Sequence, residues 1–225
     1  MDDPNPDACC PQERSKPAVP HVDKIGEHFD KRYQDWEPIA PEATDMLFNW
    51  LRQEGLAGST VMDIGCGTGE LLVRALEAGA TSGTGADLSS EAIAMASDLA
   101  HETGFDDRLD LWVGDAAVEA LDPHDVVVLD KVICCYPDAD ALIARSTDAA
   151  RNLYAFAVPE SRGLWGLIAR TRWFVFWLLE VLQRSHIPRF VHDRTEIQAK
   201  VEAAGFRPLH TGRQYVWFVA VYART

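Results

Sequence analysis

The chain has 225 residues, of which 47% are hydrophobic and 25% charged, so its composition is that of a folded globular protein and excludes global disorder. Its charge is divided unequally: residues 1–150 hold 30 acids and 10 bases, net −20, whereas residues 151–225 hold 5 acids and 11 bases, net +6. The acidic body argues against nucleic-acid binding as the main activity, because it would repel a phosphate backbone.

The first 20 residues are acidic, contain five prolines and lack the basic and apolar regions of a signal peptide. We expect a disordered tail over 1–20, followed by a single domain over 21–225. The chain has five cysteines, an odd number without a CxxC pair, which argues against a disulfide framework and a structural zinc site. We therefore expect a cytoplasmic protein that binds no metal.

Helical spacing predicts two helical pieces over 21–55, and beyond them apolar runs alternate with helical patterns. The strongest strand signal is Val126–Leu129, an apolar run typical of a strand that is buried on both faces of a parallel sheet. We expect strands at 60–64, 84–88, 108–115, within 125–135, and at 152–159, with helices at 71–78, 91–104 and 137–150. This alternation predicts an α/β fold with a doubly wound, mostly parallel sheet, which binds ligands at the carboxyl ends of its strands.

The alternation breaks after Pro159, where residues 160–190 form an aromatic, basic stretch that we expect to be a helical cap. Its longest uncharged run, 173–179, is too short to cross a membrane, which takes about 20 residues. A helix at 193–205, with Asp193 as its N-cap, and two strands are expected to close the fold. The aromatic and arginine side chains predict an acceptor site at Trp165, Arg170, Arg172, Trp173 and Trp177. A core helix, or peripheral membrane contact through 163–186, is the alternative.

The segment 61–70, VMDIGCGTGE, places an acid, Asp63, in a buried strand and glycines at every second position before a helix. Glycines let the backbone turn tightly, and the helix N-terminus favours negative groups. A dinucleotide-binding loop would have its third glycine at position 70, where this chain has Glu70. This disfavours an NAD(P)-linked oxidoreductase.

The D-x-G-x-G-x-G segment, an acid about 20 residues further on (Asp87), and G-D-A at 114–116 resemble the first three motifs of the class I S-adenosylmethionine-dependent methyltransferases. The resemblance covers roughly residues 21–160. It implies a seven-stranded Rossmann-like sheet, to which this chain adds the aromatic cap. It also implies that the cofactor is S-adenosyl-L-methionine.

The resemblance implies that Asp63 and the glycine loop hold the amino-acid end of the cofactor. It further implies that Asp87 accepts the ribose hydroxyls, and that Asp115 and the Ala116 amide serve the adenine. The full expected cofactor set is Tyr33, Asp63, Gly65, Cys66, Gly67, Gly69, Asp87, Leu88, Gly114, Asp115, Ala116, Asp130, Lys131 and Val132. Structural roles remain the alternatives: a helix cap for Asp87, a turn for Asp115, loop ordering for Asp63 and a core aromatic for Tyr33.

A narrower resemblance is carried by DVVVLDKVICCYPD, FAVPES, FVHD and the closing WFVAVYAR, which are similar to the magnesium-protoporphyrin O-methyltransferases. This chain departs from their pattern in having CCYP where a histidine commonly precedes the tyrosine. The resemblance implies carboxyl O-methylation as an alternative activity.

Proton acceptors for a hydroxyl substrate are expected at His186, His192 or Tyr136, with surface histidines as the alternative. Cys134 and Cys135 follow the central strand, where side chains alternate between faces, so one of them is expected at the mouth of the site. They are interpreted either as a soft metal or metalloid site, with Cys66, or as inert buried thiols.

The expected activity is methyl transfer to a small, flat or apolar, anionic acceptor, with O-methylation favoured. A non-catalytic cofactor-binding protein is the alternative. The sequence does not specify an oligomeric state.

Overall fold

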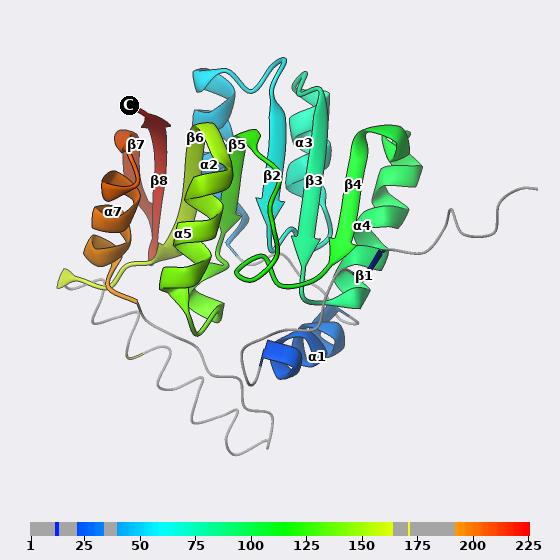
Figure 1. Cartoon of the computed structure of the whole chain (residues 1–225), viewed down its shortest axis with the longest axis horizontal. Helices are drawn as coiled ribbons and strands as arrows, with labels where there is room; N and C mark the ends of the chain where they lie inside the picture. Colours follow the sequence, from blue (N-terminus) through cyan, green and yellow to red (C-terminus); the bar gives the residue numbers. More distant parts are fainter. Residues whose placement is uncertain (1–11, 14–21, 34–39, 164–170, 172–191) are drawn as a thin grey trace, which may run out of the picture.

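The computed structural model describes residues 12–13, 22–33, 40–163, 171 and 192–225. They form one sheet with helices on both faces (Figure 1). The strands lie in the order β1-β4-β3-β2-β5-β6-β8-β7, and β8 runs antiparallel to both of its neighbours. Their bounds are β1 Gln12–Glu13, β2 Thr60–Ile64, β3 Ser82–Asp87, β4 Leu109–Val113, β5 His124–Asp130, β6 Ala150–Pro159, β7 Phe206–Gln214 and β8 Trp217–Arg224. The seven strands β2 to β8 form the expected doubly wound, mostly parallel sheet.

The two-residue strand β1 is the part of residues 1–20 that the structure describes, and the expected tail stays a prediction. Gln12 lies opposite Trp112 and Glu13 opposite Val113, in parallel pairing with β4. Without β1, β4 would be the edge of the sheet and its outer backbone groups would lack strand partners. An edge accepts any extended segment through backbone hydrogen bonds, and composition does not reveal such pairing.

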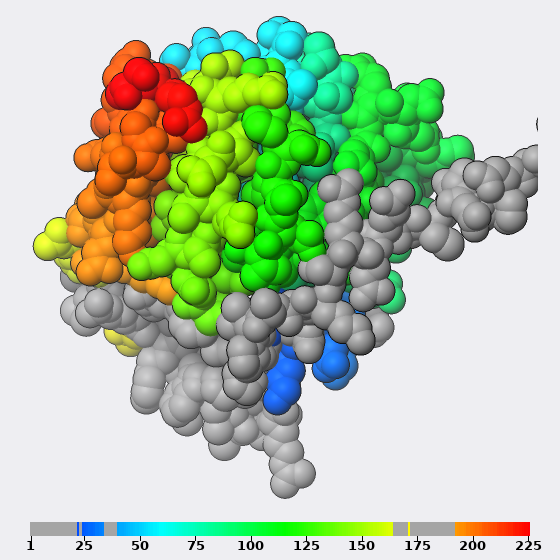
Figure 2. All heavy atoms as spheres, in the orientation of Figure 1, coloured from blue at the N-terminus to red at the C-terminus, as the bar shows by residue number. Residues whose placement is uncertain are grey.

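The helices are α1 Val22–Tyr33, α2 Pro41–Glu54, α3 Glu70–Glu77, α4 Ser90–Thr103, α5 Ala139–Ala149 and α7 Arg194–Ala203, with 3-10 turns at Asp106–Arg108 and Ile133–Cys135. Side chains of β5 alternate between two cores, so Val127 and Leu129 pack on the side of α5 and α7. Val126 and Val128 pack on the side of α2 and α3. Figure 2 shows α5 and α7 side by side on the face of the molecule that is toward the viewer. The burial of β5 on both faces confirms the prediction from its apolar run.

Local signals set several boundaries. The Ser89 hydroxyl caps α4 by accepting the Ala92 amide at 3.1 Å, and the Asp193 carboxylate caps α7 by accepting the Thr195 amide at 2.8 Å. Strand β3 is rich in glycine because a Cβ at Gly85 would lie only 2.7 Å from a Leu111 methyl group.

The strand expected within 125–135 is β5. The strand ends at Asp130, and residues 133–135 form a 3-10 turn. Of the expected cap over 160–190, the structure describes only residues 160–163 and 171. No helix in the described ranges is both long and apolar enough to cross a membrane.

Candidate functional site

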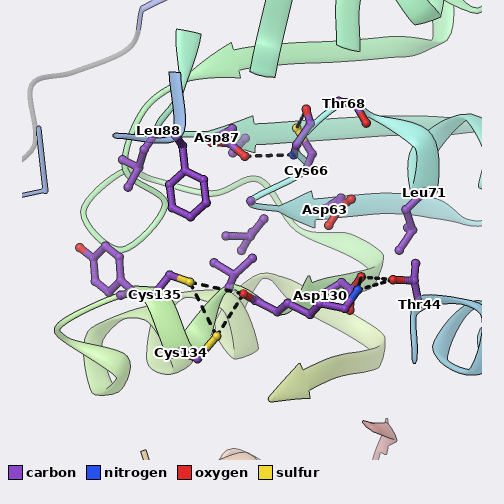
Figure 3. Close-up of a pocket in the computed structure, with 18 of the residues that line it drawn as sticks. Thr44, Asp63, Cys66, Thr68, Leu71, Asp87, Leu88, Asp130, Cys134 and Cys135 are labelled. Atoms are coloured by element: carbon purple, nitrogen blue, oxygen red, sulfur yellow. Dashed lines mark hydrogen bonds and ion pairs between the residues drawn. The ribbon is translucent and has the colours of Figure 1, made fainter. Parts of the chain in front are cut away.

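A cavity of about 650 Å³ lies at the carboxyl ends of the central strands (Figure 3). Its volume falls within the range of about 300–1,000 Å³ that is usual for small-molecule sites. Helix α1 covers it from the end of the sheet to which β2 and β3 point (Figure 1). The predicted cofactor residues that line it are Tyr33, Asp63, Gly65, Cys66, Gly67, Asp87, Leu88, Gly114, Asp115, Ala116, Asp130, Lys131 and Val132.

Two glycines of the loop after β2 allow close approach of neighbouring side chains. Gly65 and Gly67 have φ values of 71° and 54°, in the left-handed region. A Cβ at Gly65 would lie 2.3 Å from a Val132 methyl carbon, and one at Gly67 would lie 2.8 Å from the Tyr33 hydroxyl. Both positions therefore require glycine.

Gly69 is the one predicted cofactor residue that does not line the cavity. It precedes α3 at φ 77°, and a Cβ there would lie 3.0 Å from the Cβ of Ala96 in α4. This geometry gives Gly69 a packing role between two helices, and its contact with the cofactor stays a prediction.

Asp87 ties the glycine loop to the end of β3. Its Oδ2 accepts the Gly67 amide at 3.0 Å, and its Oδ1 accepts the Ser89 amide at 2.9 Å. Burial raises the pKa of this carboxyl, and the two amides lower it in part. Since Ser89 is the N-cap of α4, Asp87 is not the cap itself.

Two carboxylates beside the cavity have an oxygen that lacks a partner. Within the described part of the chain, Oδ1 of Asp63 and Oδ1 of Asp130 are buried without a hydrogen bond. Asp63 is 3% exposed, and burial raises its pKa well above the usual range, with further contributions from the charges of Asp130 and Asp87. A cationic ligand would stabilise the charged form of such a buried carboxyl group, so this site favours a cation.

Thr44, Asp130 and Lys131 form a compact polar group in the wall of the cavity. The Thr44 hydroxyl donates to Asp130 Oδ2 at 2.5 Å, and the Lys131 ammonium donates to the same oxygen at 2.8 Å. Lys131 also donates to the Thr44 hydroxyl, and its backbone has φ 63°. Sequence reasoning missed Thr44, because nothing in its own segment signals contact with a strand end 86 residues away.

Asp115 is held by two donors. Its Oδ2 accepts the Tyr136 hydroxyl at 2.8 Å, and its Oδ1 accepts the Ala117 amide at 3.0 Å. Burial, then the bond to Asp115, raises the pKa of Tyr136. The tyrosine is thus a donor held by a carboxylate, which does not suit the proton-accepting role predicted for it.

His192 lies at the start of the segment that leads into α7, and it is not among the residues lining the cavity. Its Nε2 is 3.1 Å from the Tyr136 carbonyl oxygen. Because a carbonyl only accepts, Nε2 carries the hydrogen and donates, so this nitrogen is unsuited to the predicted role. The other predicted catalytic and acceptor residues lie outside the described residues: His186, Trp165, Arg170, Arg172, Trp173 and Trp177.

Three cysteines line the cavity, but in two places. Cys66 is buried with its sulfur directed at β3, where a Cβ at Gly85 would lie 2.9 Å away. Cys134 and Cys135 lie together across the cavity, with their sulfurs 3.7 Å apart (Figure 3). The described residues contain no group of three or more histidine, cysteine or acidic side chains arranged to hold a metal ion.

The turn between β7 and β8 and the first residue of β8 each supply an aromatic residue that was not predicted from the sequence to line the site. Tyr215 is 62% exposed and has φ 51°, and Trp217 has its ring centre 5.9 Å from the Lys131 ammonium. Both line the cavity. In the sequence, the feature that could have pointed to them is the group of aromatic residues in and beside the final strand.

This geometry agrees with a comparison of the chain to known families. The sequence profile described as "Methyltransferase domain" matches residues 30–211. The chain belongs to this family. It is a class I methyltransferase, an enzyme class that uses S-adenosylmethionine, which places it apart from the NAD(P)-linked oxidoreductases.

Curated relatives include the ribosomal protein L11 methyltransferases of Escherichia coli (strain SMS-3-5 / SECEC) and Salmonella newport (strain SL254). Each is 40% identical over 85 residues, which is 38% of this chain and 29% of the relative. The match thus spans less than a third of those proteins.

Solved structures share the fold at low identity. Magnesium protoporphyrin IX methyltransferase from Synechocystis PCC 6803, with bound S-adenosylhomocysteine, has a TM-score of 0.70 at 20% identity, covering 91% of this chain and 97% of that one. An O-methyltransferase family 2 protein from Planctomyces limnophilus DSM 3776, in complex with apigenin, has a TM-score of 0.66 at 19% identity, covering 92% and 63%. Geranyl diphosphate C-methyltransferase from Streptomyces coelicolor A3(2) has a TM-score of 0.68 at 14% identity, covering 93% and 99%.

Proposed function

We propose that this chain transfers the methyl group of S-adenosylmethionine to an oxygen atom of a small, flat or apolar acceptor that carries an anionic group. The observation that carries the proposal is the combination in one cavity of unpartnered carboxylate oxygens, at Asp63 and Asp130, with aromatic side chains at Tyr215 and Trp217. The carboxylate oxygens suit a cationic cofactor, and the aromatic side chains suit a flat acceptor.

The residues present fit the cofactor. The unpartnered oxygen of Asp63 would face its ammonium, and Asp87 would accept its ribose hydroxyls with lone pairs that the two amides leave free. Asp115 would accept the adenine amine, although one of its oxygens already accepts from Tyr136. Leu88 and Val132 would supply apolar walls.

S-adenosylmethionine, when bound, supplies a methyl group activated by a sulfonium. The protein then has to orient the acceptor oxygen and exclude water, a task that suits a cavity covered by α1. A carboxylate acceptor needs no base. For a hydroxyl acceptor, Oδ1 of Asp130 is a suitable proton acceptor, because Thr44 and Lys131 fix the carboxylate through its other oxygen.

The anionic character of the acceptor is supported by the charge distribution. The last third of the chain has net charge +6 beside a body of net −20, so an anion would be drawn toward the basic segment. Solved structures with this fold act on or bind a porphyrin, apigenin and geranyl diphosphate, each of which has a flat or apolar part. A porphyrin carboxyl group is the alternative within this class.

A protein acceptor is the second candidate function. The observation in its favour is the 40% identity to ribosomal protein L11 methyltransferases over 85 residues. Because those residues are 29% of the relative, most of that protein has no counterpart in the match.

The decisive experiment offers the purified chain S-adenosylmethionine with a labelled methyl group and three kinds of acceptor. These are aromatic carboxylates and phenols, magnesium protoporphyrin, and ribosomal protein L11. We expect label on a small molecule, and alkaline treatment then separates methyl esters, which release methanol, from stable methyl ethers. The Asp87→Ala variant serves as the negative control for cofactor-dependent turnover.

Label on L11 alone would replace the small-molecule proposal by the protein-acceptor one. Tight cofactor binding without transfer to any acceptor, including those extracted from cells, would support a binding protein instead.

A further inference from the structure

Lys131 places a positive charge directly beside Asp130, the proton acceptor of the proposed function. Its ammonium lies 2.8 Å from Oδ2 of Asp130 in the wall of the cavity, and it also donates to the Thr44 hydroxyl (Figure 3). An ammonium has three N–H donors, so these two contacts leave one donor for a further partner. The centre of the Trp217 ring is 5.9 Å from the same ammonium, so aromatic surface adjoins this charge.

The backbone of Lys131 has an uncommon conformation that creates this arrangement. Its φ of 63° lies in the left-handed region, which residues with long side chains rarely adopt, and its amide donates to the Ala157 carbonyl at 3.0 Å. In an extended strand, consecutive side chains would point to opposite faces. Here the side chains of Asp130 and Lys131 meet in one wall instead. Such backbone conformations concentrate at sites that bind ligands or carry out chemistry.

The pair offers two different contacts to an acceptor. Oδ1 of Asp130 has no hydrogen bond to any described residue and can take a proton, whereas the ammonium of Lys131 can bind an anion. Both side chains are only 14% exposed, so the surrounding water weakens these contacts little. When the carboxylate takes a proton, the ammonium loses its counter-charge. An anionic oxygen of the acceptor would then replace that counter-charge.

We propose that the acceptor is a flat ring system with a hydroxyl and a carboxylate on neighbouring ring atoms, and that Lys131 binds this carboxylate. The inference rests on the proposed O-methyl transfer. Neighbouring positions follow from the spacing, because the ammonium contacts the same carboxylate group that holds the proton-accepting oxygen. The acceptor hydroxyl gives its proton to Asp130 and a lone pair to the methyl carbon. The electron pair of the broken carbon–sulfur bond stays on sulfur.

The test compares three naphthalene probes that differ in the carboxylate. In 3-hydroxy-2-naphthoate it is next to the hydroxyl, in 6-hydroxy-2-naphthoate it is on the other ring, and 2-naphthol lacks it. Initial rates with S-adenosylmethionine give kcat/KM, and calorimetry in the presence of S-adenosylhomocysteine gives the affinity without turnover. In both measurements we expect the parent protein to prefer the adjacent isomer to each of the others by about tenfold or more, because it alone gains the charge-assisted contact.

The variant Lys131→Met keeps a long side chain and removes its charge. It also takes a donor from Asp130, but that loss affects all three probes, so the preference among them isolates the contact with the carboxylate. We expect the preference to disappear in Lys131→Met. It should persist in the matched control Lys200→Met, which removes a lysine that is paired with Asp140 and does not line the cavity. Far-UV circular dichroism checks that both variants are folded.

No preference for the adjacent isomer in the parent, or no binding of any of the three probes, would overturn the inference even if Lys131→Met did not fold. A preference that survives in folded Lys131→Met would also overturn it. If that variant instead lost affinity for S-adenosylhomocysteine and kept the preference, the ammonium would belong to the cofactor site. The proposed function is judged separately, by transfer of label to any small molecule.

Discussion

The backbone amide of Gly67 donates a hydrogen bond to the carboxylate of Asp87 at 3.0 Å, joining the glycine loop after β2 to the end of β3. The same carboxylate accepts the Ser89 amide, so Asp87 fixes the positions of the loop and of the start of α4. Two motifs that lie 20 residues apart in the sequence therefore act as one structural unit.

Replacing Asp87 should lower the binding free energy of S-adenosylhomocysteine more than it lowers the free energy of unfolding. Asp87→Ala removes the acceptor of two amides and the proposed partner of the ribose, so we expect a loss of roughly 2–4 kcal/mol in binding free energy. Calorimetry measures it, with the exposed Asp107→Asn as the matched control. Unchanged affinity in a folded variant would limit Asp87 to loop ordering.

Neutralising Asp63 should stabilise the ligand-free protein and weaken cofactor binding. Because its folded-state pKa is raised, the carboxyl favours folding fully only below its unfolded pKa near 3.8, and this contribution is lost as pH rises through the raised pKa. Above that window, Asp63→Asn should therefore unfold at a temperature higher by about 2–4 °C per kcal/mol gained. Thermal scans across pH, with and without S-adenosylhomocysteine, measure both effects. A variant less stable than the parent at every pH, including above that window, would contradict a buried, uncompensated charge.

Thr44 should matter for turnover through its hydroxyl. Thr44→Val keeps the shape but leaves Asp130 without one donor, and we expect kcat/KM to fall about 10–100-fold, whereas Thr44→Ser should stay near the parent. Steady-state kinetics of both variants separates the contribution of the Thr44 hydroxyl group from that of the shape of its side chain. Equal losses in the two variants would assign Thr44 to packing.

Tyr136 should prove dispensable as a base. Its pKa is raised by burial and by Asp115, so it stays protonated throughout the working range. Tyr136→Phe should lower the free energy of unfolding by about 1–2 kcal/mol and leave kcat within about tenfold of the parent. Above all, the shape of the pH–rate profile should not change. If the high-pH limb of the parent's pH–rate profile were missing from that of Tyr136→Phe, Tyr136 would be a catalytic proton acceptor after all.

The basic residues of the segment 160–190 are predicted to bind the acceptor. Arg170→Gln/Arg172→Gln should raise the KM for the acceptor by about tenfold or more, equivalent to about 1.4 kcal/mol, without changing cofactor affinity. Arg151→Gln, at an exposed arginine of β6, is the matched control. Parent kinetics in the double variant would mean that these arginines do not recognise the acceptor.

The sequence by itself determined the order of the elements and the set of loops at the site. The apolar run at 126–129 specified a strand buried on both faces, and the glycine loop and two further motifs specified three of the loops. Of the expected cofactor residues, only Gly69 lies off the cavity. Local signals suffice here because strand burial, caps and glycine turns depend on residues close in sequence.

Only the tertiary structure decided which side chains meet. Thr44 reaches Asp130 across 86 positions, Tyr136 donates to Asp115, and the 3-10 turn brings Cys134 and Cys135 to one side. Each contact depends on where the chain leaves a strand end and on the helix that packs above it. Hydrogen bonds act over about 3 Å, so a small change in the path of the backbone creates or removes them, while the hydrophobic pattern of the sequence stays the same.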